Sequence, residues 1–212
     1  MPAHRTTQPT TTKGNAVDLS KVFLFDMDNS LADFDGTLLA GLERLRSPEE
    51  PPVTDMSGAW QQPHLRSRID LIRSQPGWWA NLPPLDRGMT VYRLAREMGF
   101  DCQILTKGPK RLSRAWMEKV DWCRRHLGEE VDVHIVSDKG LVYGVALYDD
   151  YPEYVTAWLR HRPRGLVVMP VTATNRGFTH PNVVPYDGSN LAQVERAMAV
   201  ALKRQPGEEL RL

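Results

Sequence analysis

The feature that most limits the fold is a regular alternation of apolar runs and amphipathic segments after Asp86. Short apolar runs predict strands, whereas apolar residues at helical spacing predict helices. Repetition of strand and helix requires a parallel sheet with helices on both faces. The sequence therefore predicts an α/β fold, a Rossmann-like three-layer αβα sheet. Its expected strands are 21–26, 101–106, 131–136, 145–150 and 164–170, and its expected helices are 87–99, 110–128, 151–162 and 189–204.

Two further helices interrupt this pattern directly after the first expected strand. Residues 36–47 and 61–74 both have helical apolar spacing, and a linker that contains Pro and Gly joins them. We therefore predict a small helical cap at 36–83, inserted into a core formed by 20–35 and 84–205. Residues 1–19 are expected to form a flexible tail.

Composition excludes several kinds of partner. The formal net charge of the 212 residues is +1, so we expect no overall positive electrostatic potential that would attract nucleic acid. The two cysteines show no metal-binding spacing, which disfavours zinc and disulfides and favours a reducing, cytoplasmic location. No apolar run approaches the roughly 18 residues of a membrane span, so no membrane partner is expected. The Arg- and Thr-containing, acid-poor amino terminus also leaves a transit segment open as an alternative to a plain tail.

Polar and charged residues gather where the apolar runs end. In doubly wound sheets the carboxyl ends of the strands form the ligand-binding edge, so we expect these side chains to meet. Several carboxylates together require a hard cation, and Mg²⁺ is the ion that such oxygen ligands favour. The residues are Asp26, Asp28, Thr106, Lys139, Asp149 and Asp150.

In this order the residues resemble the four motifs of the haloacid dehalogenase superfamily of phosphotransferases. The motifs stand as "DMDNSL", Thr106 in "ILTKG", Lys139 in "SDKGLVYG" and the acidic pair in "YDDYPEY". Within that superfamily, "DMDNSLADF", "PGWWANLPPL", "WCRRHLG" and "LYDDYP" resemble the 5'(3')-deoxyribonucleotidase branch. The resemblance extends from about Lys21 to Lys203. It implies the superfamily's Rossmann-like core with a cap inserted after the first strand.

The resemblance also implies a mechanism. Asp26 is expected to attack the substrate phosphorus and form an aspartyl-phosphate. Asp28 is expected to protonate the leaving oxygen and then to accept a proton from the attacking water. Thr106 and Lys139 are expected to bind phosphoryl oxygens.

The same resemblance implies a Mg²⁺ site. Its expected ligands are Asp26, one or both of Asp149 and Asp150, and Asp28 through its backbone carbonyl. This ion would relieve the repulsion between the Asp26 carboxylate and a phosphate dianion.

Three positions depart from the branch pattern. Asn29 stands where Gly is usual, and we interpret this as conservative because Asn tolerates positive φ best after Gly. Ser30 stands where Thr or Val is usual and adds a hydroxyl that could face phosphate. Lys107 and Gly108 replace a usual Ser-Pro, which alters the substrate side of the expected pocket.

Aromatic residues of the cap are candidates for holding a nucleobase. Trp78 and Trp79 are expected to stack on a base, with Phe34 as a further candidate. Packing between cap and core is the alternative for the tryptophan pair. Lys107 and Lys110 are candidate phosphate contacts, although residues such as Lys110 more often form a solvated helix face. Three other tryptophans are expected to be buried in the core: Trp116, Trp122 and Trp158.

The sequence therefore predicts a Mg²⁺-dependent phosphomonoesterase that acts on (deoxy)nucleoside monophosphates. A polynucleotide 3'-phosphate and a sugar phosphate remain alternative substrates. A non-catalytic binding protein on the same scaffold is the alternative from another class. A homodimer is compatible with all three.

Overall fold

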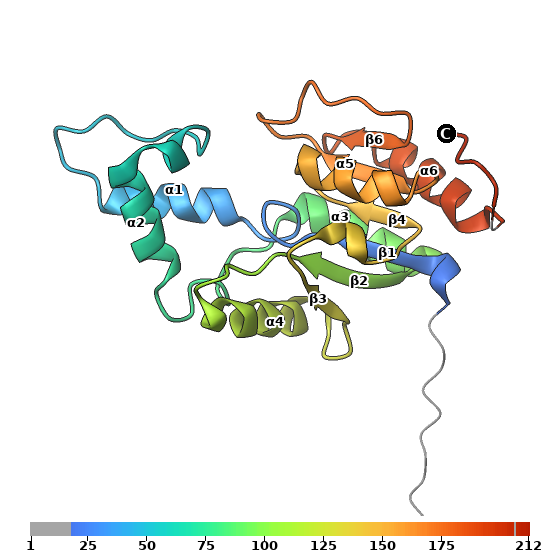
Figure 1. Ribbon diagram of the computed structural model, residues 1–212, viewed down its shortest axis with the longest axis horizontal. Helices are drawn as coiled ribbons and strands as arrows, with labels where there is room; N and C mark the ends of the chain where they lie inside the picture. Colours follow the sequence, from blue (N-terminus) through green and yellow to red (C-terminus); the bar gives the residue numbers. More distant parts are fainter. Residues whose placement is uncertain (1–17, 206) are drawn as a thin grey trace, which may run out of the picture.

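Six parallel strands form the sheet in the computed structural model, which describes residues 18–205 and 207–212 (Figure 1). The strand order is β3-β2-β1-β4-β5-β6, and every neighbouring pair is parallel. This confirms the predicted α/β class; the predictions for residues 1–17 fall outside the described part of the chain. The strands are β1 (Val22–Phe25), β2 (Asp101–Thr106), β3 (Val133–Ile135), β4 (Ala146–Tyr148), β5 (Leu166–Pro170) and β6 (Val183–Tyr186).

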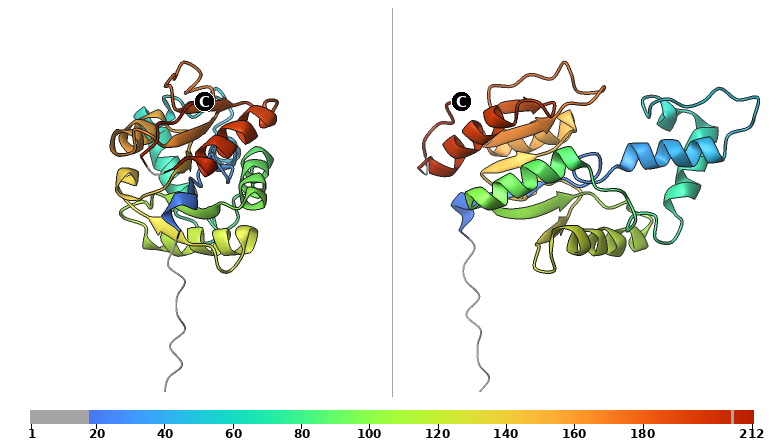
Figure 2. Two further views of the ribbon diagram at one scale, coloured as in Figure 1. Left: turned by 90° about the vertical axis from the view of Figure 1, so that its right-hand side faces the viewer. Right: turned by 180° about the vertical axis from the view of Figure 1, so that it is seen from behind.

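Alternate residues of the strands supply two separate cores, one on each face of the sheet. In β1, Phe23 and Phe25 belong to one apolar cluster, whereas Val22 and Leu24 belong to the other. Both faces are buried, which is why the strand reads as a continuous apolar run. Helices α3 (Asp86–Met98), α4 (Ser113–Leu127) and α6 (Leu191–Lys203) contribute to the first cluster, and α5 (Pro152–His161) contributes to the second. Figure 2 shows helices packed around the sheet.

Glycines end two of the core helices where the sequence predicts. Gly99 follows α3 with φ 92°, and Gly128 follows α4 with φ 114°. Such left-handed or extended positive-φ positions favour glycine. Asn190 is the N-cap residue of α6, but its side chain makes no capping hydrogen bond there.

Strand β6 was not predicted. Among the described residues it pairs with β5 alone, and it contains Pro185, an exposed residue that cannot donate a ladder hydrogen bond. Proline within a short apolar run argues against a central strand, and edge strands are where it is tolerated.

The insertion after β1 consists of α1 (Phe34–Arg44), a 3₁₀ turn (Ala59–Gln61) and α2 (Pro63–Arg73). The two helices pack closely, since a Cβ added at Gly41 would lie 3.0 Å from the Ile72 side chain. This helical unit lies beyond the carboxyl ends of the strands (Figure 1).

The two chain segments that lead into and out of this unit pair with each other. Ala32 forms an antiparallel bridge with Pro84. The Asp33 N–H donates to the Pro83 carbonyl at 2.8 Å, and the Leu85 N–H donates to the Leu31 carbonyl at 2.8 Å. Entry and exit are thus joined beside the β1 loop.

One of the three tryptophan predictions is wrong. Trp122 and Trp158 are fully buried, but Trp116 is 39% exposed. Its indole N–H donates to the Pro109 carbonyl at 3.1 Å and lies across Gly108, where an added Cβ would come within 2.2 Å of the Trp116 ring nitrogen. Trp116 thus shapes the loop after β2. Within residues 18–205 and 207–212, no helix has the length and apolar character that crossing a membrane requires.

Candidate active site

The loop after β1 holds its aspartates through a tight backbone reversal. The N–H groups of Leu31 and Ala32 both donate to the Met27 carbonyl at 2.8 Å. Asn29 has φ 59° and is the only non-glycine residue with positive φ in the part of the chain that the structure describes. Its Oδ1 also accepts from the Asp35 N–H at 2.9 Å, at the start of α1. The expectation of a left-handed residue at this position is confirmed.

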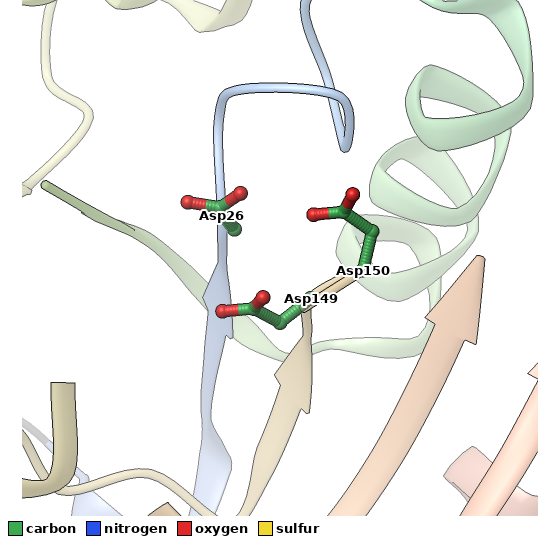
Figure 3. A group of neighbouring side chains, drawn as sticks. All are labelled: Asp26, Asp149 and Asp150. Atoms are coloured by element: carbon green, nitrogen blue, oxygen red, sulfur yellow. The ribbon is translucent and has the colours of Figure 1, made fainter. Parts of the chain in front are cut away.

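Three carboxylates meet beside this loop (Figure 3). Asp26 follows β1, and Asp149 and Asp150 follow β4, the neighbouring strand. One oxygen from each lies within 4.8 Å of the others. Residues distant in sequence thus converge at one edge of the sheet, as the pattern of strand ends predicts.

Lys139 bridges two of these carboxylates. It begins the 3₁₀ turn η3 (Lys139–Leu141), and its side chain is 1% exposed. Its ammonium donates to Asp26 Oδ1 at 2.5 Å and to Asp149 Oδ2 at 2.7 Å. Although burial opposes it, the charges of Asp149 and Asp26 raise the pKa of Lys139 above its ordinary value. Lys139 is therefore a fixed ammonium.

The remaining charge of the cluster fits a hard divalent cation. Burial raises the pKa of Asp149 to about 6, with Lys139 opposing the rise. Burial, then the charges of Asp26 and Asp149, raise the pKa of Asp150 well above its ordinary value. The Asp150 carboxylate accepts no hydrogen bond from the described residues. Of the three, Lys139 contacts only Asp26 and Asp149, so the positive charge of one lysine faces three carboxylates. Clustered oxygen ligands with an excess of negative charge suit a hard divalent cation such as Mg²⁺.

The side chain of Asp28 lies outside this trio and pairs with a different lysine. Lys119 of α4 donates to Asp28 Oδ2 at 2.6 Å and to Thr106 Oγ1 at 2.9 Å. The Lys119 side chain is fully buried, and that of Asp28 is 27% exposed. Desolvation raises the pKa of Asp28; Lys119 opposes the rise and Asp26 adds to it. Asp28 Oδ1 has no hydrogen-bond partner among the described residues.

Lys119 is a site residue that the sequence interpretation missed. It lies on the buried face of α4, four residues after Ala115 and three or four before Trp122 and Cys123. A charged residue in the middle of an apolar helical stripe is the signal that could have found it, because such a residue is rarely buried without a partner.

Glu118, the residue before Lys119, was also missed. Its carboxylate accepts from the Gly77 N–H at 2.8 Å and from the Trp79 N–H at 3.1 Å. It therefore fixes the loop that carries the paired tryptophans.

Phe34, Trp78 and Trp79 form one aromatic cluster between the insertion and the core. Their ring centroids are 4.9–5.3 Å apart. Trp79 is 3% exposed, its indole N–H donates to the Arg73 carbonyl at 3.0 Å, and its ring lies 4.8 Å from the Lys119 ammonium. Trp78 is only half-buried, so of the two tryptophans it has the larger accessible ring surface.

The other candidate substrate contacts lie at different depths. Ser30 is buried, and its hydroxyl has no hydrogen-bond partner among the described residues. The Lys107 ammonium lies 4.5 Å from the Tyr154 ring, which also lies 4.9 Å from the Lys139 ammonium. Lys110 is exposed. Contact of these residues with a substrate stays a prediction.

Comparison with known proteins gives one family and several relatives. Residues 20–186 match the family described as 5' nucleotidase, deoxy (pyrimidine), cytosolic type C protein. A human 5'(3')-deoxyribonucleotidase of the cytosolic type is 32% identical over 140 residues, which cover 60% of this chain and 69% of the relative. A Bordetella bronchiseptica protein, named among the 5'(3')-deoxyribonucleotidases, is 30% identical over 154 residues, or 69% of this chain and 82% of the relative.

A solved structure supports the fold. It is from Burkholderia xenovorans and is named among the haloacid dehalogenase-like hydrolases. It is similar with a TM-score of 0.51 at 17% identity, covering 84% of this chain and 97% of the other.

Proposed function

The chain belongs to the 5' nucleotidase, deoxy (pyrimidine), cytosolic type C protein family, and on that premise we propose that it is a Mg²⁺-dependent phosphomonoesterase acting on (deoxy)nucleoside monophosphates. The resemblance to the haloacid dehalogenase superfamily, drawn from the motifs, is confirmed by this membership and by the relatives. The observation that carries the proposal is the meeting of Asp26 with Asp149, Asp150 and Lys139 at the carboxyl edge of the sheet.

Asp26 is the proposed nucleophile. A carboxylate oxygen of Asp26 forms a bond to the substrate phosphorus while the bond from phosphorus to the ester oxygen breaks, which gives an aspartyl-phosphate. Lys139 holds Asp26 Oδ1, and so fixes the rotation of the carboxylate before substrate arrives. Water then attacks the same phosphorus, the bond from phosphorus to the Asp26 oxygen breaks, and inorganic phosphate leaves with the Asp26 carboxylate restored.

Asp28 is the proposed acid and base. Its raised pKa suits a carboxyl group that gives a proton to the leaving oxygen and afterwards takes one from water. Lys139, with a raised pKa and two carboxylate partners, does not serve as a base. The division of roles between two aspartates thus follows from their different lysine partners.

Thr106 and Lys119 position the reacting groups. Lys119 joins the Thr106 hydroxyl to the Asp28 carboxylate, and this arrangement keeps a hydroxyl and an ammonium on the phosphate side of the site. Asp26, Asp149, Asp150 and the backbone carbonyl of Asp28 would hold Mg²⁺, which when bound supplies positive charge for the phosphoryl oxygens.

The proposed substrate class depends on family membership and on the aromatic cluster. Trp78 is half-buried and its indole nitrogen, buried without a hydrogen-bond partner in the described chain, has no structural task assigned to it. A nucleobase offers a stacking face to the accessible part of such a ring. The predicted cap, cytoplasmic location and homodimer accompany this proposal as predictions.

Phosphate release from a panel of substrates tests the proposal. The panel contains 5'- and 3'-deoxynucleoside monophosphates, a sugar phosphate and a 3'-phosphorylated oligonucleotide. Nucleoside monophosphates are expected to be hydrolysed fastest, in a Mg²⁺-dependent reaction. Exclusive turnover of the oligonucleotide or of the sugar phosphate would overturn the substrate assignment.

Two variants make the test specific to the site. Asp26→Asn is expected to remove activity on every substrate, because the amide is a poor nucleophile. Asp121→Asn, an exposed residue of α4, is the matched control and is expected to keep full activity. Equal activity of Asp26→Asn and the parent, or no activity of the parent on any substrate, would favour a non-catalytic protein.

A further inference from the structure

A cavity of about 310 Å³ lies at the opposite edge of the sheet from the carboxylates. Its lining includes Leu19 and Ser20 before β1, Gly144 before β4, and Gly165 before β5. These residues precede strands, whereas Asp26 and Asp149 follow them. The cavity is therefore separate from the active site, and the proposed function does not use it.

Three arginines line this cavity without a carboxylate partner. Arg162 donates to the Gly140 carbonyl at 2.7 Å, Arg164 donates to the Gly207 carbonyl at 2.6 Å, and Arg204 donates to the Arg164 carbonyl. Within residues 18–205 and 207–212 none of the three forms a salt bridge. Arg162 Nε is buried and has no hydrogen-bond partner in that part of the chain. Several guanidinium N–H groups are thus left for a ligand.

The charges of the cavity are unbalanced. The acidic residue of its lining, Glu208, accepts a hydrogen bond from the Gln205 N–H at 2.9 Å instead of pairing with an arginine. Burial lowers the pKa of Arg204 below its ordinary value, and the charge of Arg164 lowers it further, while Tyr143 and Glu208 only partly oppose the fall. Like charges held this close are unfavourable unless an anion joins them.

We propose that this cavity binds a small phosphate-bearing anion. Guanidinium groups present forked N–H pairs that match phosphate oxygens, and a volume of about 310 Å³ accommodates a phosphate with a small organic group. Tyr143 is 49% exposed, and its ring lies 5.6 Å from the Arg162 guanidinium. It therefore offers an aromatic surface to the organic group of the ligand. A concave site in a chain of net charge +1 favours a small anion over a polynucleotide.

The experiment follows the arginine side chains directly. Inorganic phosphate is titrated into the ¹⁵N-labelled full-length protein, and the Nε–Hε resonances of Arg162, Arg164 and Arg204 are recorded by NMR. A parallel titration with chloride at equal ionic strength corrects for salt. Saturable shifts of all three resonances with phosphate, and none with chloride, are expected. Shifts that fail to saturate, or that chloride reproduces, would overturn the proposal.

Variants separate this cavity from phosphate bound at the active site. In Arg164→Ala/Arg204→Ala the affinity reported by the Arg162 resonance is expected to fall by about tenfold or more. Arg160→Ala, an exposed residue of α5 outside the cavity lining, is the matched control and is expected to bind as the parent does. Unchanged affinity in the double variant would refute the site.

A charge-preserving pair keeps the test informative if the alanine variant does not fold. Arg164→Lys/Arg204→Lys retains both charges but loses the forked donors, and it is expected to bind phosphate about threefold or more weakly than the parent. Affinity equal to the parent in this pair would contradict recognition by guanidinium groups.

Discussion

Lys119 and Asp28 are 91 residues apart in sequence, yet the lysine ammonium lies 2.6 Å from the aspartate carboxylate. The same ammonium reaches the Thr106 hydroxyl at 2.9 Å. Two loops at neighbouring strand ends are therefore joined through one buried side chain of α4. The spacing of the proposed acid from the proposed phosphate-binding hydroxyl depends on this lysine.

Replacement of Lys119 by Met is expected to lower kcat by about 10²-fold or more, because a positioned charge next to the reacting groups is lost. KM is expected to change much less, since the aromatic cluster remains. Steady-state kinetics together with a thermal melt measure this. Arg124→Met, an exposed residue of the same helix, is the control. A change in Tm alone, with normal kcat, would leave Lys119 a structural residue only.

Asp28→Asn is expected to separate the two steps of the proposed reaction. An aryl phosphate has a leaving group that needs little protonation, so formation of the phosphoenzyme should continue while its hydrolysis slows. A burst of the phenolate, and an intact mass higher by one phosphoryl group, are the expected results. The absence of both in a folded variant would argue against Asp28 as the base for water.

Asp150→Asn is expected to raise the Mg²⁺ concentration for half-maximal activity by about tenfold or more, because even outer-shell partners of a metal are typically worth that much. Activity is measured against added Mg²⁺ after dialysis with a chelator, which should itself abolish turnover in the parent. Asp121→Asn should behave as the parent does. Identical Mg²⁺ curves for the two variants would exclude Asp150 as a ligand.

Asn29 tests the backbone of the catalytic loop. Asn29→Ala is expected to lower the free energy of unfolding by about 1–2 kcal/mol more than Asn29→Gly, because a left-handed residue with a Cβ is strained. Both variants lose the hydrogen bond that Asn29 Oδ1 accepts from the Asp35 N–H, so the difference between their free energies of unfolding isolates the strain. Urea unfolding measures it. Equal stability of the two variants would show that φ relaxes here.

The Glu50–Arg68 pair predicts a pH dependence of stability. Two hydrogen bonds from Arg68, at 2.6 and 2.9 Å, and one from the Ser47 N–H lower the pKa of Glu50 to about 2. A carboxyl with a lowered folded-state pKa stabilises above its unfolded pKa, and this contribution is lost as pH falls from 4.5 toward 2.

Glu50→Gln is therefore expected to have a lower Tm than the parent at pH 7, and the difference should shrink below pH 4.5. Glu49→Gln, an exposed neighbour, is the control and should match the parent at every pH. A Tm difference for Glu50→Gln that is constant with pH would mean that ionisation of this carboxyl does not contribute.

The sequence predicted the parts of the fold that are set locally. Apolar runs predicted five strands, because strands buried on both faces are mostly apolar; Gln103 in β2 and His134 in β3 are polar exceptions. The polar residues directly after them marked the active edge, since parallel strands end together. Asn29 was also interpretable from its position alone, because few residues tolerate its backbone conformation.

What the sequence did not predict depends on long-range contacts. The apolar helical stripe marks Lys119 as a buried residue, but its partners Asp28 and Thr106 become known only when the ends of β1 and β2 meet α4. Pro185 masked β6, whose only strand partner is β5. Trp116 lies on an exposed side of its helix, where it covers Gly108 instead of entering the core.

The bridge between Ala32 and Pro84 has a mechanical consequence for the inserted helices. Two independent tethers would let that unit slide and twist relative to the sheet. With both tethers hydrogen-bonded to each other, the unit is attached to the sheet through one joint, and that joint lies four residues from Asp28. A movement of the unit about this joint would leave the proposed acid, Asp28, beside the strand that carries the proposed nucleophile, Asp26.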